Sequence, residues 1–463
     1  MTSQHTKNIG ASKKAMSKDQ FDLIAPTDLK TQTKDRNLMM QILEDLTLLN
    51  RVFCSTDYDR SIDYLKEILP FKVHSYTNRD EYNGWTIPPK WDVKEAKIFK
   101  DGKVVYDGLK HPLRVVSLST SCHVTLSLHE LKCHLHYDHR YDDAIPYHFR
   151  QMYRSWDRDW GFCVTKNFFD SLEPGRYEVL IETEESEGIL KVLDLTHQGA
   201  LPETFAFGAH LDHPGMANDD LAGCAVGVNL FKHLAKRKTK YTYKLILVQE
   251  IIGSEYYFGK TNVNNKENIL EGLWLEMLGS GTPLALQHSM EGESNMEHAA
   301  LHSIQSLRIP CKTFPFRGLV NNDEHIWEAY EIPMASLSRA PYPEYHTDRD
   351  SFSLMSDKAL NESLNVLLGV IDWLESTKLV FKHFQGNICL SNPKYDLYVD
   401  VGRPEFGTWK DEHTQKLRLL MDLIPTMRRP VTTKCLSDLV KLDEKMILPY
   451  LKLWQKKGLL AIR

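Results

Sequence analysis

Histidine and carboxylate side chains recur where predicted strands end, and side chains of these types can bind a metal ion. The apolar run FAFGA leads directly to His210 and Asp212, and Asn218-Asp219-Asp220 opens the helix that follows. Ligands of open parallel sheets bind at the carboxyl ends of the strands. A mixture of imidazole and carboxylate ligands suits a borderline divalent ion, of which zinc is the first choice. In chain order, the candidates are His210, Asp212, Asp219, Asp220, Glu250, Glu276 and His346.

Each part of this pattern also has an ordinary structural explanation. An isolated His-x-Asp sequence is common, and Asn-Asp-Asp before a helix often caps the free amides of its first turn. Glu276 could be a paired carboxylate of the core. The pattern as a whole favours a metal site, because these side chains fall where strands end and in one consistent order along the chain.

Alternating strands and helices between about residues 196 and 400 would position these side chains. ETFAFGA, YKLILVQE, GLWLEML and PMASLS are typical of strands, and helices are predicted over about 296–307 and 358–376. The alternation predicts an α/β fold, a doubly wound mixed sheet that is mainly parallel, with helices on both faces. A helix over about 33–50 and a short one in SIDYLKEIL precede it. The catalytic domain is therefore expected at 31–72 and 196–400.

The remaining stretches have a different texture. Residues 73–195 hold short β-rich runs separated by Asp-Gly, Pro-Gly and Glu-Gly turns, which predicts an inserted, mostly β domain. Residues 405–463 are typical of three helices followed by the strand-like LLAIR, the pattern of a winged-helix domain. Residues 1–30 are polar and basic without an apolar signal segment, so a disordered lead-in is expected.

Composition excludes several classes of protein. Of the 463 residues, 42% are hydrophobic and 26% are charged, which excludes a mainly disordered chain. No run approaches the roughly 18 apolar residues of a membrane-spanning helix. A net charge of −5 argues against polyanion binding by the whole chain. The eight scattered cysteines include no Cys-x-x-Cys pair, which indicates reduced thiols and a cytoplasmic protein.

The order of the candidate residues resembles that of the co-catalytic zinc aminopeptidases. The matching motifs are His-x-Asp at 210–212, Asn-Asp-Asp-x-x-Gly at 218–223, an acid at a strand end, an acid in LEMLG, and Tyr-His-Thr at 345–347. The flanking segments NGWTIPPKW, IPYHFRQMYRSWDRDWGFC and HPGMANDDLAG indicate a narrower family within this group. With them, the chain resembles the aminopeptidase-like proteins often encoded beside polysaccharide-biosynthesis genes, which carry an inserted β domain. The likeness runs from about residue 35 to the end.

The resemblance implies a role for each candidate. His210 and Glu276 would hold one zinc ion, Glu250 and His346 a second, and Asp219 would bridge the two. Asp212 would assist catalysis by orienting His210. One or two zinc ions would polarise the scissile carbonyl and lower the pKa of a bound water. Substrate-binding residues are expected at Asp323, Glu324 and Tyr345.

Two departures from the resembling sequences bear on catalysis. The peptidases place two adjacent glutamates, a base and then a ligand, where this chain has Gln249-Glu250. Because Gln cannot accept a proton, either Glu250 is the base, or it is a ligand and the base is lost or elsewhere. The second departure favours a complete metal site. Members of the narrower family often have His-x-Cys-His-Pro where this chain has His-Leu-Asp-His-Pro, so Asp212, like Glu276, matches the zinc aminopeptidases instead.

Other histidines and aromatic residues are expected to have structural roles. CHVTLSLHELKCHLHYDHR, at 122–140, is rich in histidine but lacks the ligand spacing of a closed zinc site. The aromatic residues between 147 and 162 are expected to pack where the insert meets the catalytic domain, and some of them could wall the substrate cleft.

The sequence therefore predicts a zinc-dependent hydrolase of aminopeptidase type that cleaves an amide bond next to a free amino group. Its expected substrate is a small peptide or an aminoacyl amide, and no membrane partner is expected. One alternative is a non-hydrolytic metal-binding protein that keeps the fold without the base. Another is a winged-helix regulator that binds nucleic acid, although few Arg, Asn or Gln residues stand at its predicted recognition positions. Homo-oligomerisation stays open.

Overall fold

The structure is a computed structural model that describes residues 29–77, 80–260, 268–319 and 321–463. The lead-in expected at 1–30 lies almost wholly outside these residues. Within them, no helix combines the length and the apolar character that crossing a bilayer requires.

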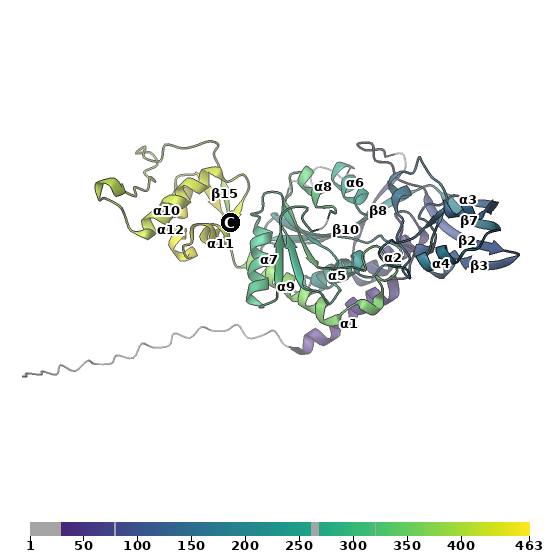
Figure 1. The fold of residues 1–463 in the computed structure, drawn as a ribbon. Helices are drawn as coiled ribbons and strands as arrows, with labels where there is room; N and C mark the ends of the chain where they lie inside the picture. The colour runs from purple at the N-terminus through teal and green to yellow at the C-terminus, as the bar shows by residue number, and fades with distance from the viewer. Residues whose placement is uncertain (1–28, 78–79, 261–267, 320) are drawn as a thin grey trace, which may run out of the picture.

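The predicted mixed sheet forms the centre of the molecule and has eight strands (Figure 1). Its strand order is β1 (Lys72–Thr77), β8 (Ile189–His197), β10 (Thr242–Val248), β9 (Thr204–His210), β11 (Ile269–Leu275), β14 (Met334–Arg339), β12 (Leu284–Gln287) and β13 (Cys311–Phe314). The four strands from β10 to β14 run parallel. The parallel register pairs His210 with Val248, so the end of β9 lies beside the start of the Gln249-Glu250 segment.

Helices cover both faces of this sheet. One face packs against α1 (Leu29–Leu46), α2 (Thr56–Ile68), α5 (Gly223–Leu234), α7 (Asn295–Ser306) and α9 (Asp357–Glu375), whose apolar residues share one core with the strands. The other face packs against α6 (Ile252–Lys260) and α8 (Glu324–Ala329) and shares a second core with the insert. The helices predicted near 33–50, 296–307 and 358–376 are confirmed, with slightly different bounds.

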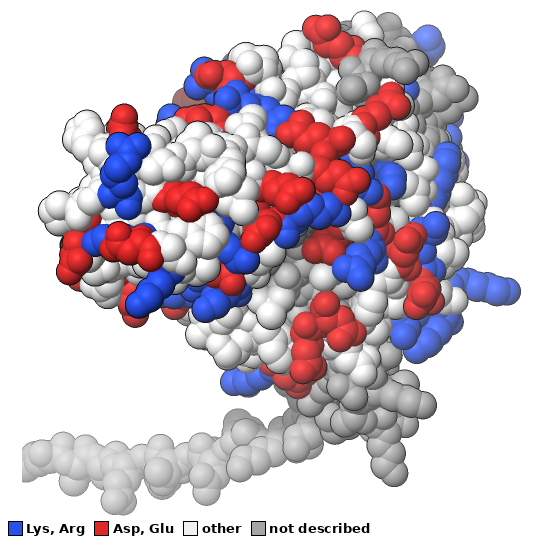
Figure 2. Space-filling model, turned by 90° about the vertical axis from the view of Figure 1, so that its right-hand side faces the viewer, with Lys and Arg blue, Asp and Glu red and all other residues white. Residues whose placement is uncertain are grey.

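The insert forms its own four-stranded antiparallel sheet. The strand order is β3 (Lys103–Asp107), β2 (Lys90–Lys100), β7 (Arg176–Ser186) and β4 (Cys122–Ser127), with a short parallel pair β5 (Leu135–His136) and β6 (Phe162–Cys163) beside it. Strands β1 and β8, at the two ends of the expected 73–195 range, pair instead in the main sheet. Basic and acidic side chains are interspersed on the face that Figure 2 displays.

The C-terminal unit combines helices α10 (Glu412–Leu423), α11 (Thr433–Val440) and α12 (Glu444–Lys456) with a small sheet. This sheet places β15 (Leu379–Lys382) between β16 (Val431–Thr432) and β17 (Leu460–Ile462). Its apolar core includes Val380, Leu390 and Leu397, which all precede the expected boundary at 405. We therefore propose a boundary near Thr377, and the assignment as a winged helix stays a prediction.

This boundary predicts different outcomes for two truncations. A chain that ends at Thr377 should be soluble and folded, because it removes β15 together with its partners. A chain that ends at Arg403 should aggregate or melt at a lower temperature, because it keeps β15 without β16 and β17. It also exposes three apolar side chains whose burial is worth roughly 1.5–3 kcal/mol each. Size-exclusion profiles and melting curves test this; equal behaviour of the two chains would refute the boundary.

Candidate metal site

Asp219 lies at the centre of a buried cluster of imidazoles and carboxylates. It belongs to the turn Asn218–Ala222 between β9 and α5. Its Oδ1 lies 3.3 Å from Nε2 of His210 and 3.3 Å from Nδ1 of His213. Its Oδ2 lies 3.1 Å from Nε2 of His346. One carboxylate therefore faces three histidines that come from two distant parts of the chain.

Glutamates from the two neighbouring strand ends complete the cluster. Glu276, just after β11, places Oε1 3.6 Å from Nε2 of His210. Its Oε2 accepts hydrogen bonds from the indole of Trp274 and from the side-chain amide of Asn322. Glu250, after β10, places Oε2 3.2 Å from Nε2 of His213. The structure thus brings together the five predicted ligands, His210, Asp219, Glu250, Glu276 and His346.

Gln249 does not belong to the pocket wall. It is buried, and its side-chain amide donates a 3.1 Å hydrogen bond to the backbone oxygen of Phe53 in the segment before α2. It therefore ties an N-terminal segment to the end of β10, while the adjacent Glu250 faces the pocket.

Three further aspartates hold the backbone around the cluster. Asp220 accepts hydrogen bonds from the backbone of His210, Gly223 and Met277, which joins the ends of β9 and β11 to the start of α5. Asp350 accepts three backbone hydrogen bonds from residues 217–219. Asp212 lies 3.4 Å from Nδ1 of His210 and also accepts the backbone N–H of Glu250. Asp220 lies within ligand reach of His210 and Glu276, but both its oxygens already accept backbone bonds.

The last glycine of the Asn-Asp-Asp-x-x-Gly motif has a steric explanation. A Cβ atom on Gly223 would lie 2.2 Å from the backbone oxygen of Leu275, which no side chain allows. The glycine therefore lets the start of α5 approach the end of β11, where Glu276 follows.

Burial and neighbouring charges shift the pKa values of the cluster in opposite directions. Burial alone would lower the pKa of His210, but the charge of Glu276 and the contacts with Asp212 and Asp219 raise it well above its usual range. Burial would also lower the pKa of His213, but the charges of Asp219 and Asp212 outweigh this effect and raise its pKa to about 10. Burial would raise the pKa of Asp219, yet the histidines lower it well below the usual range. The imidazoles of His210 and His213 and the carboxylate of Asp219 therefore stabilise each other's charged forms.

The donor atoms fit a divalent metal ion. Within the described residues, several buried atoms of the cluster have no hydrogen-bond partner of good geometry: Nε2 of His210, Nδ1 of His213, Oδ2 of Asp219 and Nε2 of His346. Buried polar groups are normally paired, so converging unpaired lone-pair atoms indicate an ion. Ligand atoms of His210, His213 and Asp219 all lie within 4.8 Å of one another. Imidazole and carboxylate donors suit zinc.

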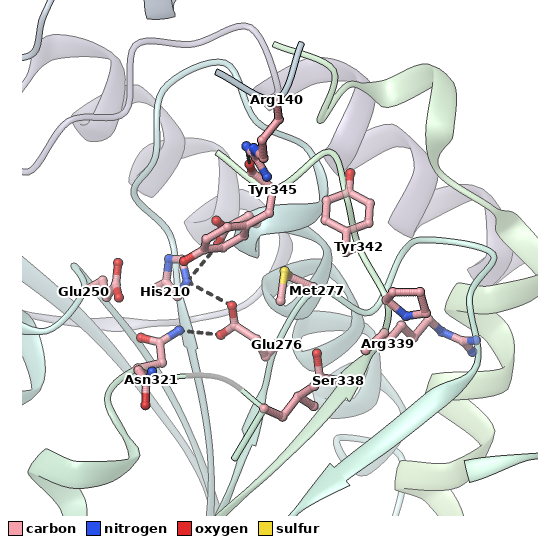
Figure 3. A pocket seen from close by; sticks show the side chains of 15 residues that line it. Arg140, His210, Glu250, Glu276, Met277, Asn321, Ser338, Arg339, Tyr342 and Tyr345 are labelled. Atoms are coloured by element: carbon pink, nitrogen blue, oxygen red, sulfur yellow. Dashed lines mark hydrogen bonds and ion pairs between the residues drawn. The ribbon is translucent and has the colours of Figure 1, made fainter. Parts of the chain in front are cut away.

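The cluster forms the floor of a pocket of about 390 Å³ (Figure 3). Four of the five expected ligands line it, namely His210, Asp219, Glu250 and Glu276. Its wall also includes Tyr342, Asn321, Asn322 and Tyr345, the last of which is an expected substrate-binding residue. Asp323 and Glu324 are fully buried and lie outside this wall. Glu324 instead accepts the backbone N–H of Asn322, and burial raises its pKa to about 8. The structure therefore places these two expected substrate-binding acids behind the pocket.

The insert holds the loop that carries His346. Arg140, which is paired with Asp138, donates to the backbone oxygens of Pro343 and Tyr345 at 3.3 and 2.8 Å. The backbone N–H of Tyr147 donates to the oxygen of His346 at 2.9 Å. The insert also reaches the other strand end, because the Tyr153 hydroxyl donates to the backbone oxygen of Glu250 at 2.7 Å.

The rings of the insert also meet the histidines of the site. Tyr147 lies edge-on to both His213 and His346, with ring centroids 5.0 and 5.3 Å apart. The aromatic run expected at this junction therefore packs directly against the cluster. Sequence reasoning did not assign His213 or Arg140 to the site; the His-Leu-Asp-His spacing was a signal for the first, and nothing local marked the second.

The histidines of the insert do not gather into a comparable cluster. His123 pairs with Glu178 at the surface, His134 stacks on Trp160, and His136 lies beside His148 with ring centroids 4.2 Å apart. Among the described residues, no group of three potential ligands converges there.

Comparisons with known proteins agree with this geometry. A family model described as "Domain of unknown function (DUF4910)" matches residues 40–377. A Clostridium acetobutylicum protein named "Putative polysaccharide biosynthesis protein with aminopeptidase-like domain" is 28% identical over 349 residues, which cover 73% of this chain and 77% of that protein.

Two solved structures share the fold. A crystal structure from Clostridium acetobutylicum, described as a "putative peptidase", has a TM-score of 0.73 at 24% identity and covers 94% of this chain and 98% of its own. A zinc aminopeptidase from Bacillus subtilis has a TM-score of 0.56 at 13% identity, covering 73% and 94% respectively. The predicted zinc-aminopeptidase fold is therefore confirmed.

The cluster predicts that two single substitutions release metal. We expect purified protein to hold about one to two equivalents of zinc, and His210→Ala or His346→Ala to lose at least one. His210→Ala should also melt at a lower temperature, because His210 is fully buried and balances three carboxylates. Elemental analysis and melting curves test this, with His123→Ala as the surface control. Unchanged zinc content in both variants would show that the site is misassigned.

The insert contacts predict an effect of Arg140 on the His346 loop. Arg140→Ala should speed hydrogen exchange of residues 342–348 in metal-free protein, because it removes two bonds to their backbone. Arg154→Ala is a matched control, since this side chain is 49% exposed, against 48% for Arg140, and its ion-pair partner among the described residues is Asp157 of the insert. Exchange rates that are the same in both variants would contradict the prediction.

Proposed function

The chain belongs to the family described as Domain of unknown function (DUF4910), and we propose that it is a zinc-dependent hydrolase of aminopeptidase type. The observation that carries this proposal is the placement of Asp219 between His210 and His346, with unpaired imidazole nitrogens on both of its oxygens. A single carboxylate between two sets of nitrogen donors is suited to bridging two ions.

The residues of the cluster would have distinct roles in binding and positioning the metal ions. His210, Asp219 and Glu276 would hold one ion, and Asp219 and His346 would contribute to a second. Asp212 lies at Nδ1 of His210 and would orient the ring so that Nε2, which faces Asp219, is available to the metal. When bound, zinc supplies Lewis acidity, which polarises a carbonyl and lowers the pKa of water to about 7. Asp220 and Asp350 keep the strand ends in place through their backbone bonds.

Glu250 is the proposed general base. The other carboxylates near the pocket are committed: Asp212 and Asp220 accept backbone N–H groups, and Glu276 accepts two side-chain bonds. The Glu250 side chain is 18% exposed, whereas those of Asp219 and Glu276 are 1% and 3% exposed. Glu250 would take a proton from the attacking water and pass it to the leaving amine.

A small peptide or aminoacyl amide would fit the pocket, whose volume of about 390 Å³ lies at the small end of ligand sites. The amide bond next to the substrate's free amino group would be cleaved, and Tyr345 would contact the bound substrate. Because one relative is named for polysaccharide biosynthesis, amino-sugar amides are a second candidate class of substrate.

Gln249 favours one alternative. Its amide stands where the resembling enzymes keep their base, and it is bound to Phe53 rather than to the pocket. If Glu250 does not act as the base, the chain is a non-hydrolytic metal-binding protein. Zinc-loaded protein assayed on a panel of aminoacyl amides and acylated amino sugars separates the two, because the alternative predicts bound zinc without hydrolysis.

Glu250→Gln tests the proposed base directly. We expect the variant to keep its zinc and lose roughly 100- to 10,000-fold in hydrolysis rate, the usual contribution of a positioned acid–base group. Zinc content and rate are measured on the same sample. A parallel fall in both would make Glu250 a ligand, and full activity would remove it from the mechanism.

A further inference from the structure

We infer that His213 is itself a metal ligand, oriented by Glu250, so that three histidines and not two surround Asp219. This inference rests on the proposed metal-dependent function. It assigns a ligand that the resemblance to zinc aminopeptidases does not supply, and it gives Glu250 a contact other than the metal.

The two nitrogens of His213 face different carboxylates. Nδ1 lies 3.3 Å from Oδ1 of Asp219, and Nε2 lies 3.2 Å from Oε2 of Glu250. If Nε2–H donates to Glu250, the lone pair of Nδ1 points to the side of Asp219, where the other unpaired donors converge. Histidine ligands of metal ions almost always donate their second ring N–H to a carboxylate or carbonyl.

His210 shows the same arrangement with its nitrogens exchanged. Its Nδ1 lies 3.4 Å from Asp212, and its Nε2 lies 3.3 Å from the same Oδ1 of Asp219. The rings of His210 and His213 are nearly perpendicular, with centroids 4.6 Å apart. Two carboxylate–histidine pairs therefore point at one oxygen from different directions, as two ligands of one centre would.

The position of the ring also bears on Glu250. Asp219 and Glu250 contact opposite nitrogens of His213, so the imidazole lies between these two carboxylates. A ligand role for Glu250 beside Asp219 would require the ring to move away. With His213 as the ligand, Glu250 keeps Oε1 free of hydrogen bonds within the described part of the chain, and this oxygen can act as the base.

The fold fixes His213 in this place. The residue is 2% exposed, and its backbone has a φ of 76°, which is uncommon for a residue other than glycine. Tyr147 from the insert packs edge-on against its ring. A buried imidazole held by a strained turn and a neighbouring domain is positioned for one geometry.

The test compares zinc binding by a variant of His213 with zinc binding by a variant of its partner Glu250. His213→Asn suits the purpose because Asn tolerates a positive φ better than most residues. Metal-free protein is titrated with zinc against a chromophoric chelator, and the cobalt-substituted protein gives an absorption spectrum that reports imidazole ligands. We expect His213→Asn to bind one ion at least tenfold more weakly, with a changed cobalt spectrum. Glu250→Gln keeps an acceptor for Nε2–H and should bind both ions within a few-fold of the unmodified protein.

His288→Asn is the matched control, because His288 pairs with Glu297 at 2.9 Å outside the pocket. It should leave zinc affinity and cobalt spectrum unchanged, and melting curves of the metal-free variants show that each is folded. Unchanged affinity in His213→Asn, or loss of an ion in Glu250→Gln, would overturn the inference. Zinc binding without hydrolysis in the unmodified protein would overturn the proposed function and leave the His213 assignment standing.

Discussion

The architecture of the site depends on one buried carboxylate that needs partners. Asp219 is 1% exposed, and an unpaired charge at such a depth would be strongly destabilising. The fold meets this need by bringing imidazoles to both of its oxygens from segments more than a hundred residues apart. Parallel strands make this possible, because the ends of β9, β10 and β11 lie at one edge of the sheet. Asp220 and Asp350 then fix the connecting backbone.

The main α/β domain supplies only part of this arrangement. Within the main α/β domain, Asp212 contacts His210, and Trp274 and Asn322 donate hydrogen bonds to Glu276. In contrast, the insert contacts the backbone of both His346 and Glu250, by way of Tyr147 and Tyr153. The insert is therefore a structural part of the pocket, and its docking supports the segments that carry His346 and Glu250.

Local patterns in the sequence predicted the mixed α/β sheet, and together with the resemblance to zinc aminopeptidases they predicted most of the cluster. Strand periodicity located His210, Glu250 and Glu276, because chemistry in a parallel sheet gathers where strands end. His213 was not assigned, since its side chain enters the cluster only through an unusual backbone turn.

Contacts between distant segments were beyond the sequence patterns. The roles of Arg140 and Tyr153 depend on how the insert docks, which no local periodicity encodes. For the same reason Asp323 and Glu324 were expected in the pocket, although α8 turns them inward. Strand pairing likewise assigned β1 and β8 to the main sheet and β15 to the C-terminal unit.

X-ray diffraction from zinc-soaked crystals, recorded on both sides of the zinc absorption edge, tests the central claim most directly. The account predicts anomalous density beside Asp219, with one peak near His210, His213 and Glu276 and a second near His346. Density confined to the histidines of the insert, or none near Asp219 at saturating zinc, would contradict it.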